Sequence, residues 1–281
     1  MSTRCIVKTD TAREVLSEFC GTMLLTLFNI AGPLNVAISG ISNAFLANVA
    51  CAGGVFLGMA TAMSNSGAHL NPIVTTSFAS RGLFPWKKAP HYIIAQYLGA
   101  FVGAVITYMN FAEGINKFDG GVRVFGGSPN ATGIFFATYP NAGVSIITCI
   151  FDTMLCSALL LYAICAITDE YNSRIPIYLW APCVSFMVMI IISTLSYNCA
   201  VAMNPARDLA PRLFTVIAGY SFEGFLPHGG VFWVVATFVP HLGGLIGAQF
   251  YHFSISLQKP GEQDRIEEAA DGKLMRSNTS E

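Results

Sequence analysis

The sequence predicts an all-α membrane protein with six transmembrane helices and two re-entrant half-helices that enter the membrane without crossing it. Three observations predict this fold class. Of the 281 residues, 53% are hydrophobic and only 11% are charged, whereas soluble domains average about 25% charged residues. No Asp, Glu, Lys or Arg occurs from residue 19 to residue 80. The dipeptide Asn-Pro occurs twice, in segments that match each other.

Six apolar runs are each long enough to cross a bilayer, which takes about 20 residues. They cover about residues 15–34, 42–63, 90–110, 143–167, 175–196 and 231–253. Most basic residues outside these runs gather on one side of the resulting layout. The positive-inside rule predicts that this side is cytoplasmic, and both termini lie on it. We therefore expect a multi-pass protein of the plasma membrane, embedded in the lipid bilayer.

The layout also divides the chain into segments. Residues 1–12 are predicted to be a cytoplasmic N-terminal segment, residues 13–255 the membrane domain, and residues 256–281 a disordered cytoplasmic tail, because the tail is polar and charged. Inside the membrane domain we expect one repeat, a long extracellular loop and a second repeat, which cover about 13–110, 111–142 and 143–255. The sequon at Asn130 lies in that loop, where it is a possible glycosylation site.

Composition excludes several classes of function. Lys and Arg number 15 against 16 Asp and Glu, a net charge of −1, so the chain has no positive excess to bind nucleic-acid phosphates. Its eight cysteines form no Cys-x-x-Cys pair and no cluster with histidine, so we expect neither a disulfide framework nor a metal site. No Ser-His-Asp or paired-carboxylate spacing suggests an enzyme.

The chain contains an internal repeat. Asn71-Pro72 and Asn204-Pro205 lie 133 residues apart, and the acidic residues Glu18 and Asp152, which fall inside apolar runs, lie 134 apart. Two features at nearly one offset indicate a duplicated unit of three spans. Because three is odd, the second copy enters the membrane from the opposite side, and the repeats are inverted.

Each Asn-Pro pair is a start signal for a helix, because Asn is a preferred N-cap and Pro suits the first helical position. The helices that follow, about 72–80 and 205–216, are too short to span. The non-helical stretches before them, 67–70 and 200–203, should line a pore, since such backbone survives at membrane depth only inside protein or against water. The positive ends of the two half-helices should meet near the midplane and repel cations.

These residues resemble the major intrinsic protein family, the aquaporins. The resemblance rests on the six spans, on Ser66-Gly-Ala-His-Leu-Asn-Pro and on Asn204-Pro-Ala-Arg-Asp, and it covers about residues 13–253. The glycerol-conducting branch, the aquaglyceroporins, is suggested by Asp208 and Arg212 together with Ala137-Thr-Tyr-Pro and Ile167-Thr-Asp-Glu-Tyr-Asn.

The resemblance implies a homotetramer of right-handed bundles, each with its own passive pore for glycerol, water and small uncharged solutes such as urea. Protons and ions would be excluded, and neither a cofactor nor an enzymatic step is expected. Two alternatives remain open: a water-selective aquaporin, and a non-conducting structural membrane protein of the same fold. A secondary transporter is less favoured because the repeat centres carry neutral Asn.

By position, the resemblance also assigns site residues. The side-chain amides of Asn71 and Asn204 would form the pore centre. The selectivity filter would consist of Cys51, Ile192, Val201 and Arg207. A ladder of backbone carbonyls would come from Gly67, Ala68, His69, Asn198, Cys199 and Ala200. Structural roles would fall to Pro72, Pro205, Asp208 and Arg212, and to Glu18 and Asp152, which would accept hydrogen bonds from backbone N–H groups of the re-entrant loops.

The sequence departs from the family pattern at several positions. Ile192 replaces the histidine of water-selective members, and Cys51 and Val201 are small where glycerol facilitators have large aromatics. We therefore expect a wider filter that favours glycerol over water-only passage and admits urea. Ile73 replaces the usual Ala after Asn-Pro, and His241 an aliphatic residue. Cys51 and Cys199 are predicted to lie near the outer half of the pore, where mercurials would block it.

Overall fold

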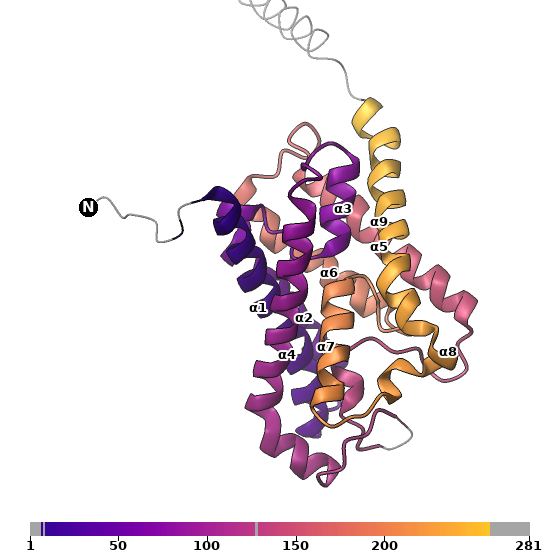
Figure 1. Ribbon diagram of the computed structural model, residues 1–281. Helices are drawn as coiled ribbons and strands as arrows, with labels where there is room; N and C mark the ends of the chain where they lie inside the picture. Colours follow the sequence, from indigo (N-terminus) through magenta and orange to yellow (C-terminus); the bar gives the residue numbers. More distant parts are fainter. Residues whose placement is uncertain (1–6, 8, 127–128, 259–281) are drawn as a thin grey trace, which may run out of the picture.

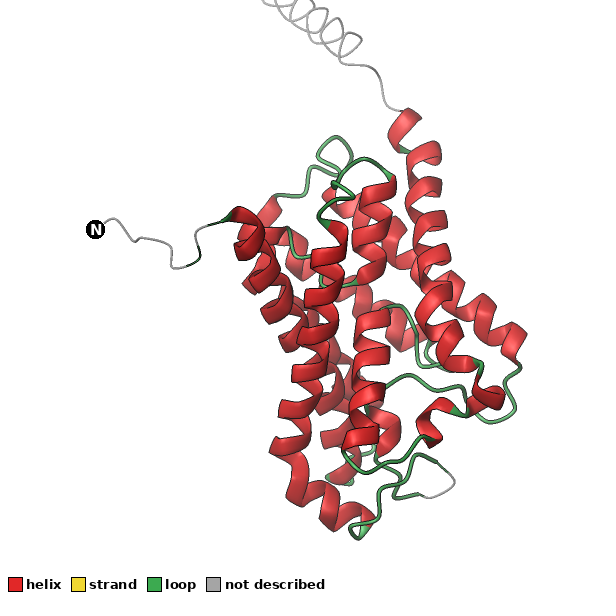
Figure 2. Cartoon of the chain, viewed as in Figure 1, coloured by secondary structure: helices red, strands yellow, loops and turns green. Residues whose placement is uncertain are grey.

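The computed structural model describes residues 7, 9–126 and 129–258, and within these ranges it contains helices and loops but no strand (Figure 2). The parts of the predicted terminal segments at residues 1–6, 8 and 259–281 lie outside the described residues. Six helices are long and apolar enough to cross a membrane. They are α1 (Asp10–Ile38), α2 (Ala44–Ser66), α4 (Ala89–Asp119), α5 (Ile146–Thr168), α6 (Trp180–Leu195, preceded by the short turn η2 at Ile177–Leu179) and α9 (Phe232–Ser254).

The two predicted half-helices are α3 (Pro72–Ser80) and α7 (Pro205–Ile217). The remaining elements are single turns in loops: η1 (Gly133–Phe135), η3 (Glu223–Phe225), α8 (Pro227–Gly230) and η4 (Ser256–Gln258). Figure 1 shows α3 in the upper half of the bundle and α7 in the lower half, so that each approaches the middle from its own end. This is the inverted arrangement that the odd number of spans per repeat predicts.

Several helix boundaries differ from the predicted ones by a few residues, those of α1 included, and at α4 and α6 the local backbone shows how the difference arises. Helix α4 continues past residue 110 to Asp119 and ends at Gly120, whose φ of 68° is the left-handed conformation common after helices. The predicted loop 111–142 therefore begins as helix. Helix α6 begins at Trp180 instead of near residue 175: the backbone of Pro176 is extended, with ψ of 142°, and residues 177–179 form the turn η2.

The repeats exchange their half-helices. In the first repeat α1 packs on α2 and α4, and in the second α5 packs on α6 and α9. Half-helix α3 of the first repeat, however, lies against α9 of the second, and α7 of the second lies against α4 of the first. Each half-helix is thereby buried between the repeats.

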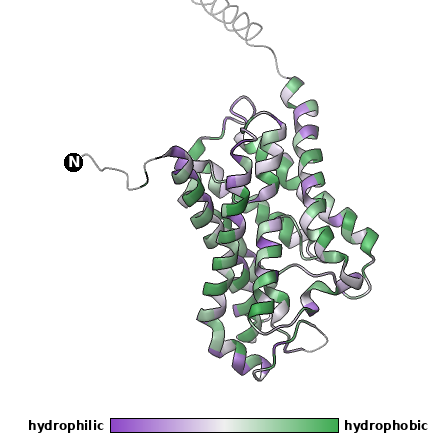
Figure 3. Ribbon diagram, in the orientation of Figure 1, coloured by the Kyte–Doolittle hydropathy of each residue, from purple (hydrophilic) through white to green (hydrophobic). Residues whose placement is uncertain are grey.

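Glycines allow the helix pairs of both repeats to approach closely. A Cβ added to Gly99 of α4 would lie 2.3 Å from the carbonyl oxygen of Phe19 in α1, and one added to Gly247 of α9 would lie 2.0 Å from that of Ala158 in α5. Small residues at such crossings are typical of membrane helix packing, where van der Waals contact replaces the hydrophobic effect. Hydrophobic residues occur along much of the helices (Figure 3), and many large hydrophobic side chains are exposed, as expected for contact with lipid.

Candidate functional site

Each half-helix begins at an Asn-Pro pair, as predicted. The Asn71 side-chain oxygen accepts a hydrogen bond from the Ile73 N–H at 3.1 Å. The Asn204 side-chain oxygen accepts from the N–H groups of Ala206 and Arg207, both at 3.2 Å. Pro72 and Pro205 occupy the first helical positions and are buried. These caps fix the direction of both helix starts.

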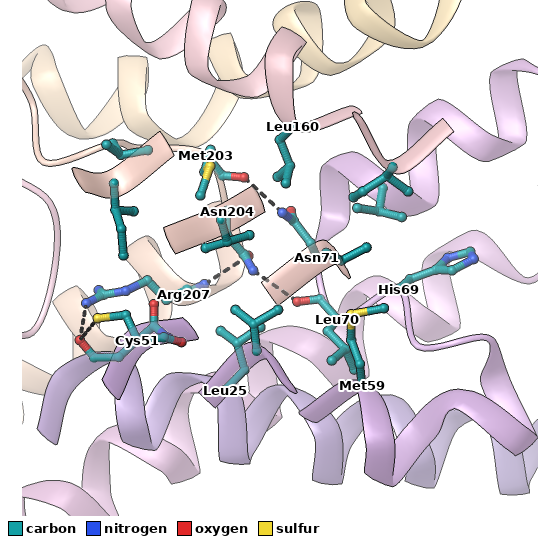
Figure 4. A pocket seen from close by; sticks show the side chains of 18 of the residues that line it. Leu25, Cys51, Met59, His69, Leu70, Asn71, Leu160, Met203, Asn204 and Arg207 are labelled. Carbon is teal, nitrogen blue, oxygen red and sulfur yellow. Dashed lines mark hydrogen bonds between the residues drawn. The ribbon is translucent and has the colours of Figure 1, made fainter. Parts of the chain in front are cut away.

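The two starts face each other and are joined by a reciprocal pair of hydrogen bonds (Figure 4). The Asn71 Nδ2 donates to the Met203 carbonyl at 2.9 Å, and the Asn204 Nδ2 donates to the Leu70 carbonyl at 3.0 Å. Because an amide nitrogen carries two hydrogens, each Asn keeps one donor beyond this cross-bond. In each Asn the side-chain oxygen is thus held by the N–H groups of its own half-helix, and the side-chain nitrogen by a carbonyl of the opposite loop.

The loops before the half-helices adopt left-handed backbone at residues other than glycine. In the first loop φ is 55° at Ala68 and 53° at Leu70, and in the second it is 54° at Ala200 and 57° at Val201. Such a conformation costs of order 1–3 kcal/mol per residue and persists only where its surroundings hold it in place. At the repeat offset of 133 residues, Gly67 (φ 80°) and Ala68 correspond to Ala200 and Val201, so left-handed backbone recurs at two equivalent positions of the loops, whereas the left-handed Leu70 has no such counterpart.

The carboxylate of Glu18 holds the first loop in place by hydrogen bonds. Its Oε1 accepts from the Ser66 hydroxyl at 2.6 Å and the His69 N–H at 2.9 Å. Its Oε2 accepts from the Leu70 N–H at 2.7 Å and the Gln96 side-chain amide at 2.8 Å. Glu18 has no exposed surface, and four donors compensate for its burial. It therefore has the loop N–H partners that the sequence predicts.

Asp152 differs from its repeat counterpart, and the prediction that it binds loop N–H groups is wrong. Its Oδ1 accepts from the Asn198 side-chain amide at 2.9 Å, and its buried Oδ2 has no hydrogen-bond partner among the described residues. An aspartate side chain is one methylene shorter than a glutamate. Asp152 therefore reaches the second loop through the Asn198 side chain.

A cavity of about 670 Å³ runs past both Asn side chains and is lined by residues of both repeats. Of the predicted carbonyl ladder, Gly67, Ala68, His69 and Ala200 line it, and so do Val201, Ala202 and Met203. The other two predicted ladder residues are not among its lining. The Asn198 carbonyl accepts the Asn141 N–H at 2.9 Å, and Cys199 is wholly buried in a cluster with Cys149 and Phe232. Apolar side chains, including Leu25, Met59 and Leu160, supply much of the wall (Figure 4).

All four predicted filter residues, Cys51, Ile192, Val201 and Arg207, line this cavity. The guanidinium of Arg207 donates from Nη1 to the Phe136 carbonyl at 2.9 Å and from Nη2 to the Asn29 carbonyl at 3.1 Å. Figure 4 shows Arg207 and Cys51 on one side of the Asn pair and His69 on the other. The guanidinium is thus oriented by two backbone oxygens that belong to other elements.

Asp208 and Arg212 form a buried ion pair one helical turn apart in α7. The Arg212 Nη2 lies 2.9 Å from the Asp208 Oδ1 and 2.6 Å from the Thr138 carbonyl. The Asp208 Oδ2 accepts from the Thr138 N–H at 2.7 Å and from the Thr138 hydroxyl. Both charges are therefore bonded to the loop that follows η1.

Sequence reasoning missed Asn29 and Phe136, whose carbonyls hold Arg207. Phe136 contributes only a backbone oxygen and leaves no signal. Asn29 has a signal, because Pro33 follows it four residues later inside a spanning helix. Asn130, the residue of the predicted glycosylation site, is exposed. The ring of His69 packs among Phe78, Phe84 and Tyr92.

The sequence and the fold are similar to those of known proteins. Residues 5–251 match the model of the family described as Major intrinsic protein. The chain is 40% identical over 258 residues to Aquaporin-3 of Milnesium tardigradum, covering 86% of this chain and 77% of that one. It is 35% identical over 265 residues to human Aquaporin-9, covering 94% and 89%. The X-ray structure of the aquaglyceroporin from Plasmodium falciparum matches with a TM-score of 0.79 and 28% identity, over 87% and 97% of the two chains.

Proposed function

Because the chain belongs to the major intrinsic protein family, we propose that it is a passive channel for glycerol, water and small uncharged solutes such as urea. The observation that carries the proposal is the cavity between the repeats, which combines two fixed amide donors with an apolar wall. A polyol has this same division, since its hydroxyls need partners while its carbon chain does not.

The pore centre accounts for the exclusion of protons. A water molecule there accepts the remaining N–H of Asn71 and that of Asn204, so both of its lone pairs are occupied. It cannot then accept a proton from a neighbouring water, and the proton relay is broken. The positive ends of α3 and α7, each equivalent to about half a unit charge, add a barrier to cations.

The filter accounts for the passage of glycerol. Arg207 presents a fixed guanidinium, which has five N–H donors and can bind two adjacent hydroxyls of one solute. Ile192 and Val201 face the same cavity and bury the carbon chain. Since no aromatic ring stands at Cys51 or Val201, the filter is wide enough for urea. The carbonyls of the two loops bind the hydroxyls on the way to the Asn pair.

We propose that the protein works as a homotetramer, one pore per subunit, in the plasma membrane, with both termini in the cytoplasm. The arrangement of basic residues supports this orientation. It puts the loop around η1 and the sequon at Asn130 outside the cell, where the exposed Asn130 is available for glycosylation.

The test is stopped-flow light scattering on proteoliposomes that contain the full chain. We expect faster equilibration of water, glycerol and urea than in empty liposomes, unchanged by a Na⁺ or H⁺ gradient. An Arg207→Ala variant should change the ratio of glycerol to water permeability. Acceleration of water alone would favour the water-selective alternative, and no acceleration at all would favour the non-conducting one.

A further inference from the structure

The backbone carbonyl of Asn29 lies inside α1 but has no helical donor. In an α-helix the carbonyl of one residue accepts the N–H of the residue four positions later. For Asn29 that residue is Pro33, which has no N–H. The proline ring also crowds this carbonyl and turns it away from the helix axis. An unpaired acceptor is therefore available in the middle of a membrane-spanning helix.

This acceptor is used by the filter. The Arg207 Nη2 donates to the Asn29 carbonyl at 3.1 Å, and the Cys51 thiol lies against the same oxygen at 3.8 Å. Figure 4 shows both bonds as dashed lines that meet at one oxygen. Hydrogen bonds from a charged group are about twice as strong as neutral ones, so this contact weighs heavily on the position of the guanidinium.

The Asn29 side chain adds a second link to the same place. Its Nδ2 donates to the Cys51 carbonyl at 3.0 Å, which joins α1 to α2 at the level of the filter. One turn of α1 thus contacts two of the four filter residues, Cys51 and Arg207. Both Asn29 and Pro33 line the cavity.

We propose that Asn29 and Pro33 are positioning residues of the filter: Pro33 leaves the Asn29 carbonyl free to hold the guanidinium of Arg207 in the orientation that selects glycerol. The inference rests on the proposed channel function. The Phe136 carbonyl holds the Nη1 side of the guanidinium and the Asn29 carbonyl holds the Nη2 side. With both in place the group cannot rotate, and its other N–H donors keep a constant direction.

The orientation of Arg207 matters more for glycerol than for water. Glycerol has to bind two hydroxyls to one guanidinium in a fixed geometry, whereas a single water molecule adapts to whichever donor is nearest. A guanidinium held at one end only would therefore slow glycerol more than water. This difference separates a positioning role from a general loss of structure, which would lower both permeabilities together.

Pro33→Ala tests the proposal, because it restores an N–H that competes with Arg207 for the Asn29 carbonyl. In proteoliposomes we expect the ratio of glycerol to water permeability to fall about threefold or more, the effect of weakening one hydrogen bond to a charged group. In the Arg207→Ala background, Pro33→Ala should leave the ratio unchanged, since the two residues act through one contact. The matched control is Pro240→Ala, which removes a proline inside α9 and should preserve the ratio.

A second measurement does not depend on transport. The melting temperatures of the wild type, the two single variants and the double variant in detergent form a mutant cycle, and we expect the two effects to be non-additive. The proposal would be overturned if the changes in melting temperature were additive. It would also be overturned if Pro33→Ala changed the ratio of glycerol to water permeability equally with and without Arg207. If the wild type conducts no glycerol but the melting temperatures remain coupled, the proposed function fails while the contact stands.

Discussion

Arg212 and Asp208, paired inside α7, also bind the backbone of Thr138 in the loop after η1. That loop carries Phe136, whose carbonyl holds Arg207. The ion pair has at most 1% of either side chain exposed, and each charge has further partners at Thr138. A buried pair that begins at the residue directly after the filter arginine thus fixes the loop that orients the filter.

Removal of one partner of this pair should destabilise the protein strongly. Asp208→Ala leaves the Arg212 charge buried without its carboxylate, which typically costs about 3–5 kcal/mol. We expect a large fall in the melting temperature of the detergent-solubilised protein. Asp10→Ala is the matched control, because Asp10 pairs with Arg13 while 81% exposed, and exposed pairs contribute little. Equal effects of the two variants would contradict the structural role of Asp208.

The two repeat acids should respond unequally to loss of charge. Among the described residues, Glu18 accepts from four donors, whereas one side-chain oxygen of Asp152 accepts from the Asn198 amide and the other has no partner. Glu18→Gln turns an NH₂ group toward existing donors, so at least one bond to the former carboxylate is lost, at about 1.5–3 kcal/mol each. Asp152→Asn should cost less.

The measurement is the fraction of each variant that remains monodisperse on heating in detergent. If Asp152→Asn lost a larger monodisperse fraction than Glu18→Gln, the hydrogen bonds of Glu18 to the first loop would not be what sets the stability of the protein.

The half-helices could be predicted from sequence, whereas the contacts around the filter could not. Asn and Pro act on their own neighbours, so the start of α3 at Pro72 and of α7 at Pro205 follows from local rules. Arg207 is held by Asn29, which lies 178 positions earlier. No periodicity within a helix reports a contact at that separation.

Matching positions in a repeat are also an incomplete guide. The repeat relates Glu18 to Asp152, but a difference of one methylene changes the partner from loop backbone to the Asn198 side chain. In the same region the Asn198 carbonyl bonds to Asn141 and does not line the cavity. Of the residues to which position assigns a carbonyl ladder, Gly67, Ala68, His69 and Ala200 therefore line the cavity, whereas the two residues before Ala200 do not.

Mercurial block should depend on one of the two cysteines that the sequence singles out. Cys51 lines the cavity, whereas Cys199 is wholly buried against Cys149 and Phe232. We expect a mercurial to inhibit the wild type and Cys199→Ala alike, and to lose its effect on Cys51→Ala. Water permeability before and after treatment, with thiol reversal, is the measurement. Inhibition that persists in Cys51→Ala would place the reactive thiol elsewhere.

A histidine at position 192 should convert the filter toward water selectivity. Ile192 is an apolar wall of the cavity, and a carbon chain can lie against it. Ile192→His replaces this apolar wall with a polar ring, which water can bind but a CH group cannot. We expect glycerol permeability to fall about tenfold or more, the range in which a single group in a pocket discriminates between substrates. Water permeability should change much less.

Ile192→Leu is the conservative control for this variant, because it keeps an apolar wall of similar volume and should retain both permeabilities. Stopped-flow measurements with glycerol and water on the same proteoliposome preparations give the ratio directly. If Ile192→His lowered water and glycerol equally, the substitution would act by closing the passage. The apolar character of position 192 would then not be what admits glycerol.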